Sequence, residues 1–283
     1  MNTFKKTTLA LAIATLAGGA MAQSAPAPAP EPEKSPITAN VTLVNDYRFR
    51  GISQTNYQPA IQGGFDYAHD SGLYIGNWNS TINWISNTTS GYATPSVSAP
   101  LEMNFYGGYK KDLIAPGFAT DLGVLQYFYP QKGSYPAGSM LNPNTTEIYL
   151  AQNYTFGALS GFGKINYGLT NIFGIPNSSG SYYLDLTSNF DTGIWGLTVN
   201  GHIGYQYVAG QPATPSGWSA STPNNISYTD WKLGLTKDFG GGLSLSAAYV
   251  STNANASWWN TWTANSYGSA GRGGAVVGLT KTF

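Results

Sequence analysis

Within segments that alternate between apolar and polar residues, the charged residues lie almost wholly at every second position, so they would share the inner face of a barrel of strands. This parity gives an inward set of seven acidic residues, five basic residues and one histidine: Asp46, Arg48, Arg50, Asp66, Glu102, Lys110, Asp121, Glu147, Lys164, Asp185, His202, Asp230 and Lys232. There they would line a water-filled channel and set its selectivity, or pair across the lumen of a plugged barrel. The near balance of signs predicts weak ion selectivity if the lumen is open.

Catalysis is the less favoured chemistry. The sequence has no G-x-S-x-G elbow in a strand-to-helix setting, no H-E-x-x-H and no phosphate-binding loop. His202 shares its face with Asn200, which keeps open a hydrolase built on Ser, His and Asn, although a hydrogen-bonded lumen histidine is the better interpretation. Neither His69 nor His202 has the spacing of a metal site. We therefore expect no catalytic residue, no metal and no cofactor.

The composition favours a membrane barrel over a water-soluble domain. Charged residues make up 9% of the chain, against the roughly 25% usual in globular proteins, whereas aromatic residues make up 14%. Beyond the N-terminal leader no apolar run is long enough for a membrane helix. A barrel resolves the conflict because only alternate residues of its strands face lipid. With 13 basic and 13 acidic residues, the chain has no basic excess to bind nucleic acid, and without cysteine it has no disulfides.

The N-terminus has the pattern of an export signal followed by a spacer. Lys5 and Lys6 precede an apolar stretch over 7–17, and Ala20-Met21-Ala22 supplies a small-x-small cleavage pattern. We expect residues 1–22 to be a signal peptide. Residues 23–36 are rich in Ala and Pro and form an extended periplasmic spacer, and residues 37–283 form the barrel.

Period-two alternation and turn signals divide the remainder into twelve predicted strands: 37–50, 59–69, 73–84, 100–110, 118–129, 144–156, 162–172, 181–190, 197–208, 228–238, 243–253 and 272–283. The connections after even-numbered strands are short, and those after odd-numbered strands are mostly longer. In outer-membrane barrels, short turns face the periplasm and long loops face outward. The pattern predicts an all-β, transmembrane antiparallel up-and-down barrel in a Gram-negative outer membrane, with both barrel termini periplasmic.

The last strand ends on an aromatic residue. Ala275, Val277 and Leu279 share one face of the strand that stops at Phe283. Such an end resembles the signal by which the barrel assembly machinery recognises its substrates. Lys281 interrupts the apolar face, but near the membrane interface a lysine can extend its amine to water.

Several segments carry a resemblance to a known family. The stretch Val44-Asn45-Asp46-Tyr47-Arg48-Phe49-Arg50-Gly51-Ile52-Ser53-Gln54-Thr55 resembles the opening of the TorF-type porins, a proteobacterial family of formerly unknown function. Residues 59–67, 72–78, 105–109, 228–234 and 237–240 support this likeness, which spans roughly 37–283 and fades in the long loops. The resemblance implies an outer-membrane barrel with pore activity, but neither a substrate nor a set of functional residues.

We therefore expect a porin-like channel for passive diffusion of small hydrophilic solutes or ions, with outer-membrane lipid as its surroundings. Two alternatives stay open. A non-conducting structural or adhesion barrel would use long outer loops such as 254–271, where Trp258, Trp259 and Trp262 cluster. An outer-membrane hydrolase would use His202.

Overall fold

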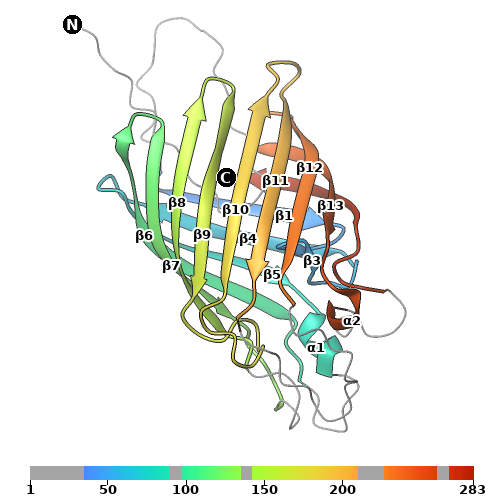
Figure 1. The fold of residues 1–283 in the computed structure, drawn as a ribbon. Helices are drawn as coiled ribbons and strands as arrows, with labels where there is room; N and C mark the ends of the chain where they lie inside the picture. Colours follow the sequence, from blue (N-terminus) through green and yellow to red (C-terminus); the bar gives the residue numbers. More distant parts are fainter. Residues whose placement is uncertain (1–34, 90–96, 135–141, 210–225, 260–267) are drawn as a thin grey trace, which may run out of the picture.

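The computed structural model describes residues 35–89, 97–134, 142–209, 226–259 and 268–283. Within them the chain forms one closed antiparallel barrel of twelve strands (Figure 1). Each strand pairs with its sequence neighbours, and the first strand closes the ring by pairing with the last. The predicted fold class and strand count are confirmed. The predicted signal peptide and nearly all of the predicted spacer lie outside the described residues.

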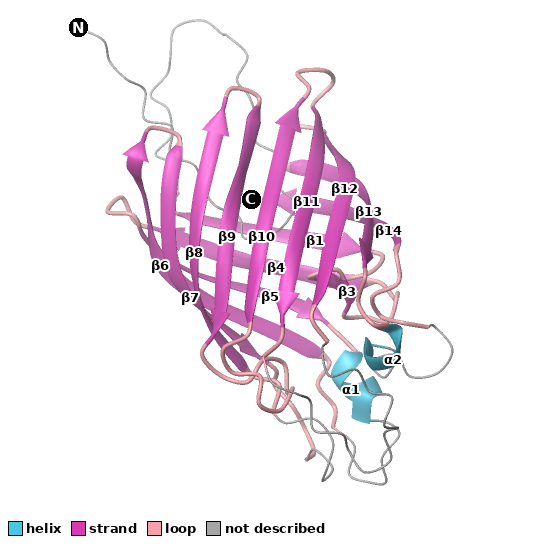
Figure 2. Ribbon diagram, viewed as in Figure 1, coloured by secondary structure: helices cyan, strands magenta, loops and turns pink. Residues whose placement is uncertain are grey.

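The barrel strands are β1 (Ile37–Val44), β4 (Ala60–Ala68), β5 (Leu73–Thr81), β6 (Leu101–Ala115), β7 (Phe118–Phe128), β8 (Thr145–Phe156), β9 (Leu159–Gly168), β10 (Tyr182–Asp191), β11 (Leu197–Tyr207), β12 (Tyr228–Asp238), β13 (Leu243–Thr252) and β14 (Gly274–Thr282). A small hairpin of β2 (Arg48–Phe49) and β3 (Ile52–Ser53) precedes β4, and two short helices, α1 (Trp84–Thr89) and α2 (Ala256–Trp259), lie in the loops. Figure 2 separates these elements by type.

Alternation of side chains explains why these segments are strands of a membrane barrel. On β12, Trp231, Leu233 and Leu235 are exposed on the outside, whereas Asp230 and Thr236, at positions of the opposite parity, are buried on the inside. The same alternation recurs around the ring and gives an apolar outer belt with a polar interior. No helix in the described part of the chain is long and apolar enough to cross a membrane.

The two ends of the barrel differ in their connections. The connections 69–72, 116–117, 157–158, 192–196 and 239–242 are short and form the end that we call the turn end. The opposite end, the loop end, carries the longer connections together with α1 and α2, and lies at the bottom of Figure 1. This confirms the alternation of short and long connections read from the sequence.

One strand boundary differs in a way that matters for function. The sequence predicts a strand over 37–50, but β1 ends at Val44, whose partner on the next strand is already Ala60. The intervening residues 45–59 leave the wall and carry the β2–β3 hairpin, and we call this segment the inner hairpin. Asp46, Arg48 and Arg50 therefore do not lie on a barrel strand, and their assignment to the first strand is wrong.

Candidate functional site: the lumen of the barrel

The inner hairpin folds into the barrel at its loop end. Its tip is a two-residue turn, Arg50-Gly51, in which both residues have positive φ, 46° and 77°, as a type I′ turn requires. A side chain at Gly51 would collide with Asp230 and Thr252, so glycine is required there by space as well as by conformation. Arginine at the preceding position carries a backbone strain of roughly 1–2 kcal/mol.

Contacts of Arg50 with the opposite wall compensate for this strain. Its Nη2 donates hydrogen bonds to both carboxylate oxygens of Glu147 on β8, at 2.9 and 2.7 Å, and its Nη1 donates to Gln206 on β11 at 2.6 Å. The guanidinium also lies 4.5 Å from the ring centre of Tyr183, and the side chain is only 6% exposed. Burial by itself would lower the pKa of Arg50, but the charge of Glu147 raises it above its usual value.

A second polar network holds the base of the inner hairpin. Asp46 forms an ion pair with Arg48 and accepts a hydrogen bond of 2.6 Å from the hydroxyl of Ser53. The Nη1 of Arg48 donates to the carbonyl oxygens of Gly51 and Arg272, at 3.0 and 2.9 Å. These bonds hold the hairpin inside the barrel and tie it to the start of β14.

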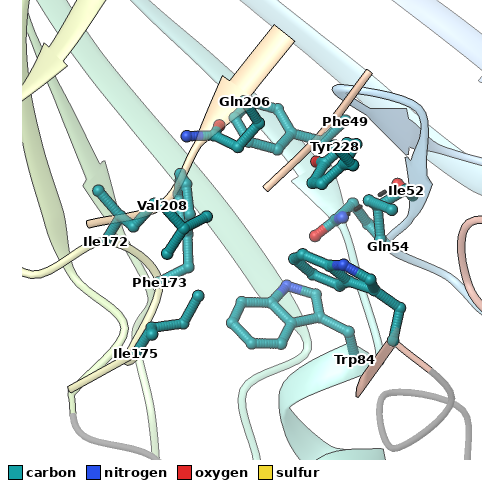
Figure 3. A pocket seen from close by; sticks show the side chains of 11 residues that line it. Phe49, Ile52, Gln54, Trp84, Ile172, Phe173, Ile175, Gln206, Val208 and Tyr228 are labelled. Carbon is teal, nitrogen blue, oxygen red and sulfur yellow. Dashed lines mark hydrogen bonds between the residues drawn. The ribbon is translucent and has the colours of Figure 1, made fainter. Parts of the chain in front are cut away.

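Apolar side chains pack around the inner hairpin at the loop end. Phe49 packs edge-on against Tyr127 and Phe173, with ring centres 5.5 and 5.2 Å apart. Figure 3 shows the cavity that remains beside them, which has a volume of about 20 Å³, room for roughly one water molecule. We call Phe49, Tyr127 and Phe173, together with the aromatic and aliphatic side chains that line this cavity, the apolar cap.

The tryptophans that the adhesion alternative would present outward contribute to this cap. Trp258 and Trp259 are buried, and Trp259 packs edge-on against Tyr228 with ring centres 5.2 Å apart. They therefore offer no exposed adhesive surface. Trp262 lies outside the described residues.

A row of inward charged residues runs across neighbouring strands of the barrel wall, from β6 to β12. In successive pairings across β6 to β12, the inward partners are Lys110, Asp121, Ala151, Lys164, Asp185, Gly204 and Asp230. We call this the charge row. Because strands in a barrel are tilted, such a row climbs around the wall rather than forming a level ring. Lysine and aspartate occur side by side in it, so both signs of charge are distributed over more than half of the wall.

Tyrosines lie across inward glycines and reach carboxylates on the next strand but one. Tyr74 on β5 donates to Asp121 on β7 at 2.6 Å, and Tyr106 on β6 donates to Asp66 on β4 at 2.6 Å. A Cβ on the glycine in between would collide with the tyrosine. The superposed pairs are Tyr74 over Gly108, Tyr106 over Gly76, Tyr149 over Gly123 and Tyr183 over Gly204. These rings therefore lie flat on the wall instead of pointing to the barrel axis.

His202 is fixed between two carboxylates. Its Nδ1 lies 3.0 Å from Asp185 and its Nε2 lies 2.9 Å from Asp230, and the hydroxyls of Tyr183 and Thr187 lie 3.1 and 3.0 Å from the ring nitrogens. Both ring nitrogens therefore already have carboxylate and hydroxyl neighbours. Among the described residues no serine contacts this ring, and no cluster of possible metal ligands occurs. The geometry does not favour a hydrolase.

All thirteen residues selected from the sequence face the interior. Asp46, Arg48 and Arg50 do so from the inner hairpin, and the other ten from the strands: Asp66 on β4, Glu102 and Lys110 on β6, Asp121 on β7, Glu147 on β8, Lys164 on β9, Asp185 on β10, His202 on β11, and Asp230 and Lys232 on β12. The sequence reasoning missed Gln206 and the tyrosine bridges, because their roles depend on strand register and on the inner hairpin.

Comparisons with solved structures return outer-membrane porins of low sequence identity. The KdgM porin has a TM-score of 0.48 and 8% identity over 87% of this chain and 98% of its own. OccAB1 of Acinetobacter baumannii has a TM-score of 0.44 and 12% identity over 80% and 58%, and OprD of Pseudomonas aeruginosa has 0.41 and 12% over 80% and 59%. These are likenesses of shape, and no solute or activity transfers from them to this chain.

Sequence comparison supplies the family. No match was found among curated protein sequences. The model of a bacterial protein family of unknown function, Gcw_chp, matches residues 30–283. That designation does not carry the TorF name, so the TorF resemblance stays a prediction. Because the match runs from before the first strand to the end of the last, the chain belongs to the Gcw_chp family of bacterial proteins of unknown function.

Proposed function

We propose that this protein is an outer-membrane channel for the passive diffusion of small hydrophilic solutes, narrowed at its loop end by the inner hairpin. The observation that carries the proposal is the charge row. A closed barrel with an apolar exterior needs no lysines and aspartates inside for stability, because burying charged groups costs free energy unless they are well paired. Charges retained on an inner wall are the usual means by which a pore solvates and selects solutes.

The proposed orientation places the turn end and both barrel termini in the periplasm and the loop end outside the cell. The alternation of short and long connections supports it, as in other outer-membrane barrels. The exposed Phe283 after β14 supports recognition of this end by the barrel assembly machinery, and the apolar belt supports contact with outer-membrane lipid.

Single-channel recording of the purified full-length protein in a planar lipid bilayer tests the channel. We expect discrete, voltage-stable current steps in potassium chloride. The control is the same detergent preparation without protein. Folding is verified separately by the heat-dependent shift of the barrel in gel electrophoresis. A barrel that inserts and stays folded without carrying current would contradict the proposal.

A second candidate is a permanently closed structural barrel. The apolar cap and the buried Arg50–Glu147 pair favour it, because both fill space at the loop end and the cavity in Figure 3 is small. The same recording separates the two functions: a closed barrel gives no current at any voltage. For the hydrolase alternative, we expect no esterase activity from the purified protein and no difference between it and His202→Ala.

A further inference from the structure

The two sides of the lumen differ in the size of their inward side chains. On β4, β1, β14 and β13, four adjacent strands of the ring, the inward positions include Gly64, Asn40, Thr42, Gly278, Ser246 and Ala248. We call this side the small-residue wall. Asp66 on β4 is its inward charged residue, and the wall contains none of the residues of the charge row and none of the bridging tyrosines.

The opposite wall, on β6 to β10, is filled by long side chains. Tyr106, Tyr149 and Tyr183 lie on it beside the lysines and aspartates of the charge row. Several inward residues there are almost inaccessible, with Asp121 1% exposed, Ala151 4% and Thr187 6%, whereas Lys110, Lys164 and Asp185 are half-buried. The tyrosines and charges cover even the short side chains between them.

The atoms around the inward glycines differ between the two walls in the same way. A Cβ added at Gly123 or Gly204 would strike a tyrosine. A Cβ added at Gly278 would have as its nearest neighbours Ser246 Oγ at 3.2 Å and Thr42 Cγ2 at 3.6 Å, both on the strands that flank it. All of the nearest atoms belong to the two flanking strands, so no tyrosine covers Gly278 as one covers Gly123 and Gly204.

Exposure agrees with this view of the space. Asn40 and Thr42 on β1 and Gln62 on β4 point inward, and all three are half-buried rather than buried. Since the inner face of a closed barrel is separated from lipid, water that reaches these side chains does so through the lumen.

We propose that solutes cross the barrel along the small-residue wall, off the central axis, with Thr42 and Ala248 setting the width of the path and the charge row facing them. The inference rests on the proposed channel function and adds the route and the class of solute. Hydroxyl and amide groups line one side, and the lysines and aspartates of the charge row lie on the other. Such a path suits small hydrophilic solutes with no net charge, because the charge row presents both lysines and aspartates to it.

The chain contains no cysteine, so single substitutions to cysteine can be labelled without background. Thr42→Cys on the small-residue wall is matched by Thr187→Cys on β10, and Ala248→Cys is matched by Ala151→Cys on β8. All four positions face inward. Each variant is treated with a water-soluble thiosulfonate reagent, the extent of labelling is followed by mass spectrometry, and the current is recorded before and after treatment.

We expect labelling at positions 42 and 248 to be at least tenfold faster than at 187 and 151, and to reduce the unit current in the first two only. Equal labelling rates on the two walls, or faster labelling at 151 and 187, would overturn the proposed route. The two matched pairs are independent tests. If a variant of one pair does not fold, the other pair still gives the comparison between the walls.

Labelling does not require current, which separates this inference from the proposed function. If the unmodified protein carries no current but positions 42 and 248 label rapidly, the channel function is contradicted, whereas the access of water to the small-residue wall is supported. If the protein conducts but labelling shows no preference between the walls, the channel stands and the route fails.

Discussion

At the scale of the residue, Arg50 combines an unfavourable backbone with favourable side-chain contacts. Its positive φ is one that asparagine or glycine adopts more readily, while its Nη2 donates to both carboxylate oxygens of Glu147 and its Nη1 donates to Gln206. Strain of this kind persists only where surrounding contacts fix the conformation. The side chain, rather than the turn, therefore keeps the hairpin tip against the opposite wall.

Replacement of Arg50 by Asn separates the side-chain contacts from the backbone. Asn-Gly is a preferred pair for a type I′ turn, so the turn is retained or improved while the contacts to Glu147 and Gln206 are lost. We expect a larger single-channel conductance and a reversal potential shifted toward cation preference, because Glu147 then faces the lumen without its partner. Removing one member of a buried pair also costs about 3–5 kcal/mol, which would lower the unfolding temperature.

The double variant Arg50→Asn/Glu147→Gln is the control for charge. It should return the reversal potential to the wild-type value and keep the larger conductance. An Arg50→Asn channel with unchanged conductance and selectivity would show that this arginine neither narrows the lumen nor acts on its ions.

At the scale of the element, the inner hairpin is a separable insertion between two strands that are already neighbours. Val44 and Ala60 are paired across β1 and β4, so the barrel wall is continuous without residues 45–59. The hairpin crosses to β8 and β11 and carries Phe49 into the apolar cap. Its removal should open the loop end without affecting closure of the ring.

We predict that a variant in which Asn-Gly replaces residues 45–59 still assembles and conducts several times more current per channel. The two-residue turn fits the Val44–Ala60 register, and the main obstruction at the loop end is gone. Replacing Gly157-Ala158 with Asn-Gly at the turn end serves as the control, and its conductance should equal that of the wild type. A hairpin-deleted barrel with wild-type conductance would place the narrowest point elsewhere.

The inner hairpin also marks where sequence reasoning fails. Strands such as β12 and β13 are predictable because outward leucines and inward polar residues alternate between glycine-rich turns. Past Val44, however, Asp46, Arg48 and Arg50 continue the same parity, so nothing local distinguishes strand from insertion. Only their partners far along the chain, such as Glu147 on β8 and Arg272 just before β14, decide the conformation.

At the scale of the whole molecule, the interior is close to electrically balanced but unevenly arranged. The sequence predicts the inward set and its near neutrality from parity alone. It does not predict the charge row or the small-residue wall, because both depend on the register of pairs such as Lys164 with Asp185. Local patterns determine which face a residue occupies, whereas register determines its neighbours.

Neutralising one charge of each sign in the charge row should shift ion preference in opposite directions. We expect the wild-type reversal potential in a potassium chloride gradient to lie close to zero. Lys164→Gln should shift it toward cation preference, and Asp121→Asn toward anion preference, because they stand on either side of Ala151 in the same row. Shifts of the same sign in both variants would rule out a direct action of these charges on permeating ions.

The position of the inner hairpin early in the chain constrains the order in which the molecule folds. The hairpin precedes eleven of the twelve barrel strands, and Arg50 is 97 residues from Glu147. Contacts of such separation form slowly because a long loop must close first. The seam between β1 and β14 joins only Asn40–Val44 with Gly278–Thr282. Since β14 is made last, the wall closes around a hairpin that is already present, and threading it in after closure would require the seam to reopen.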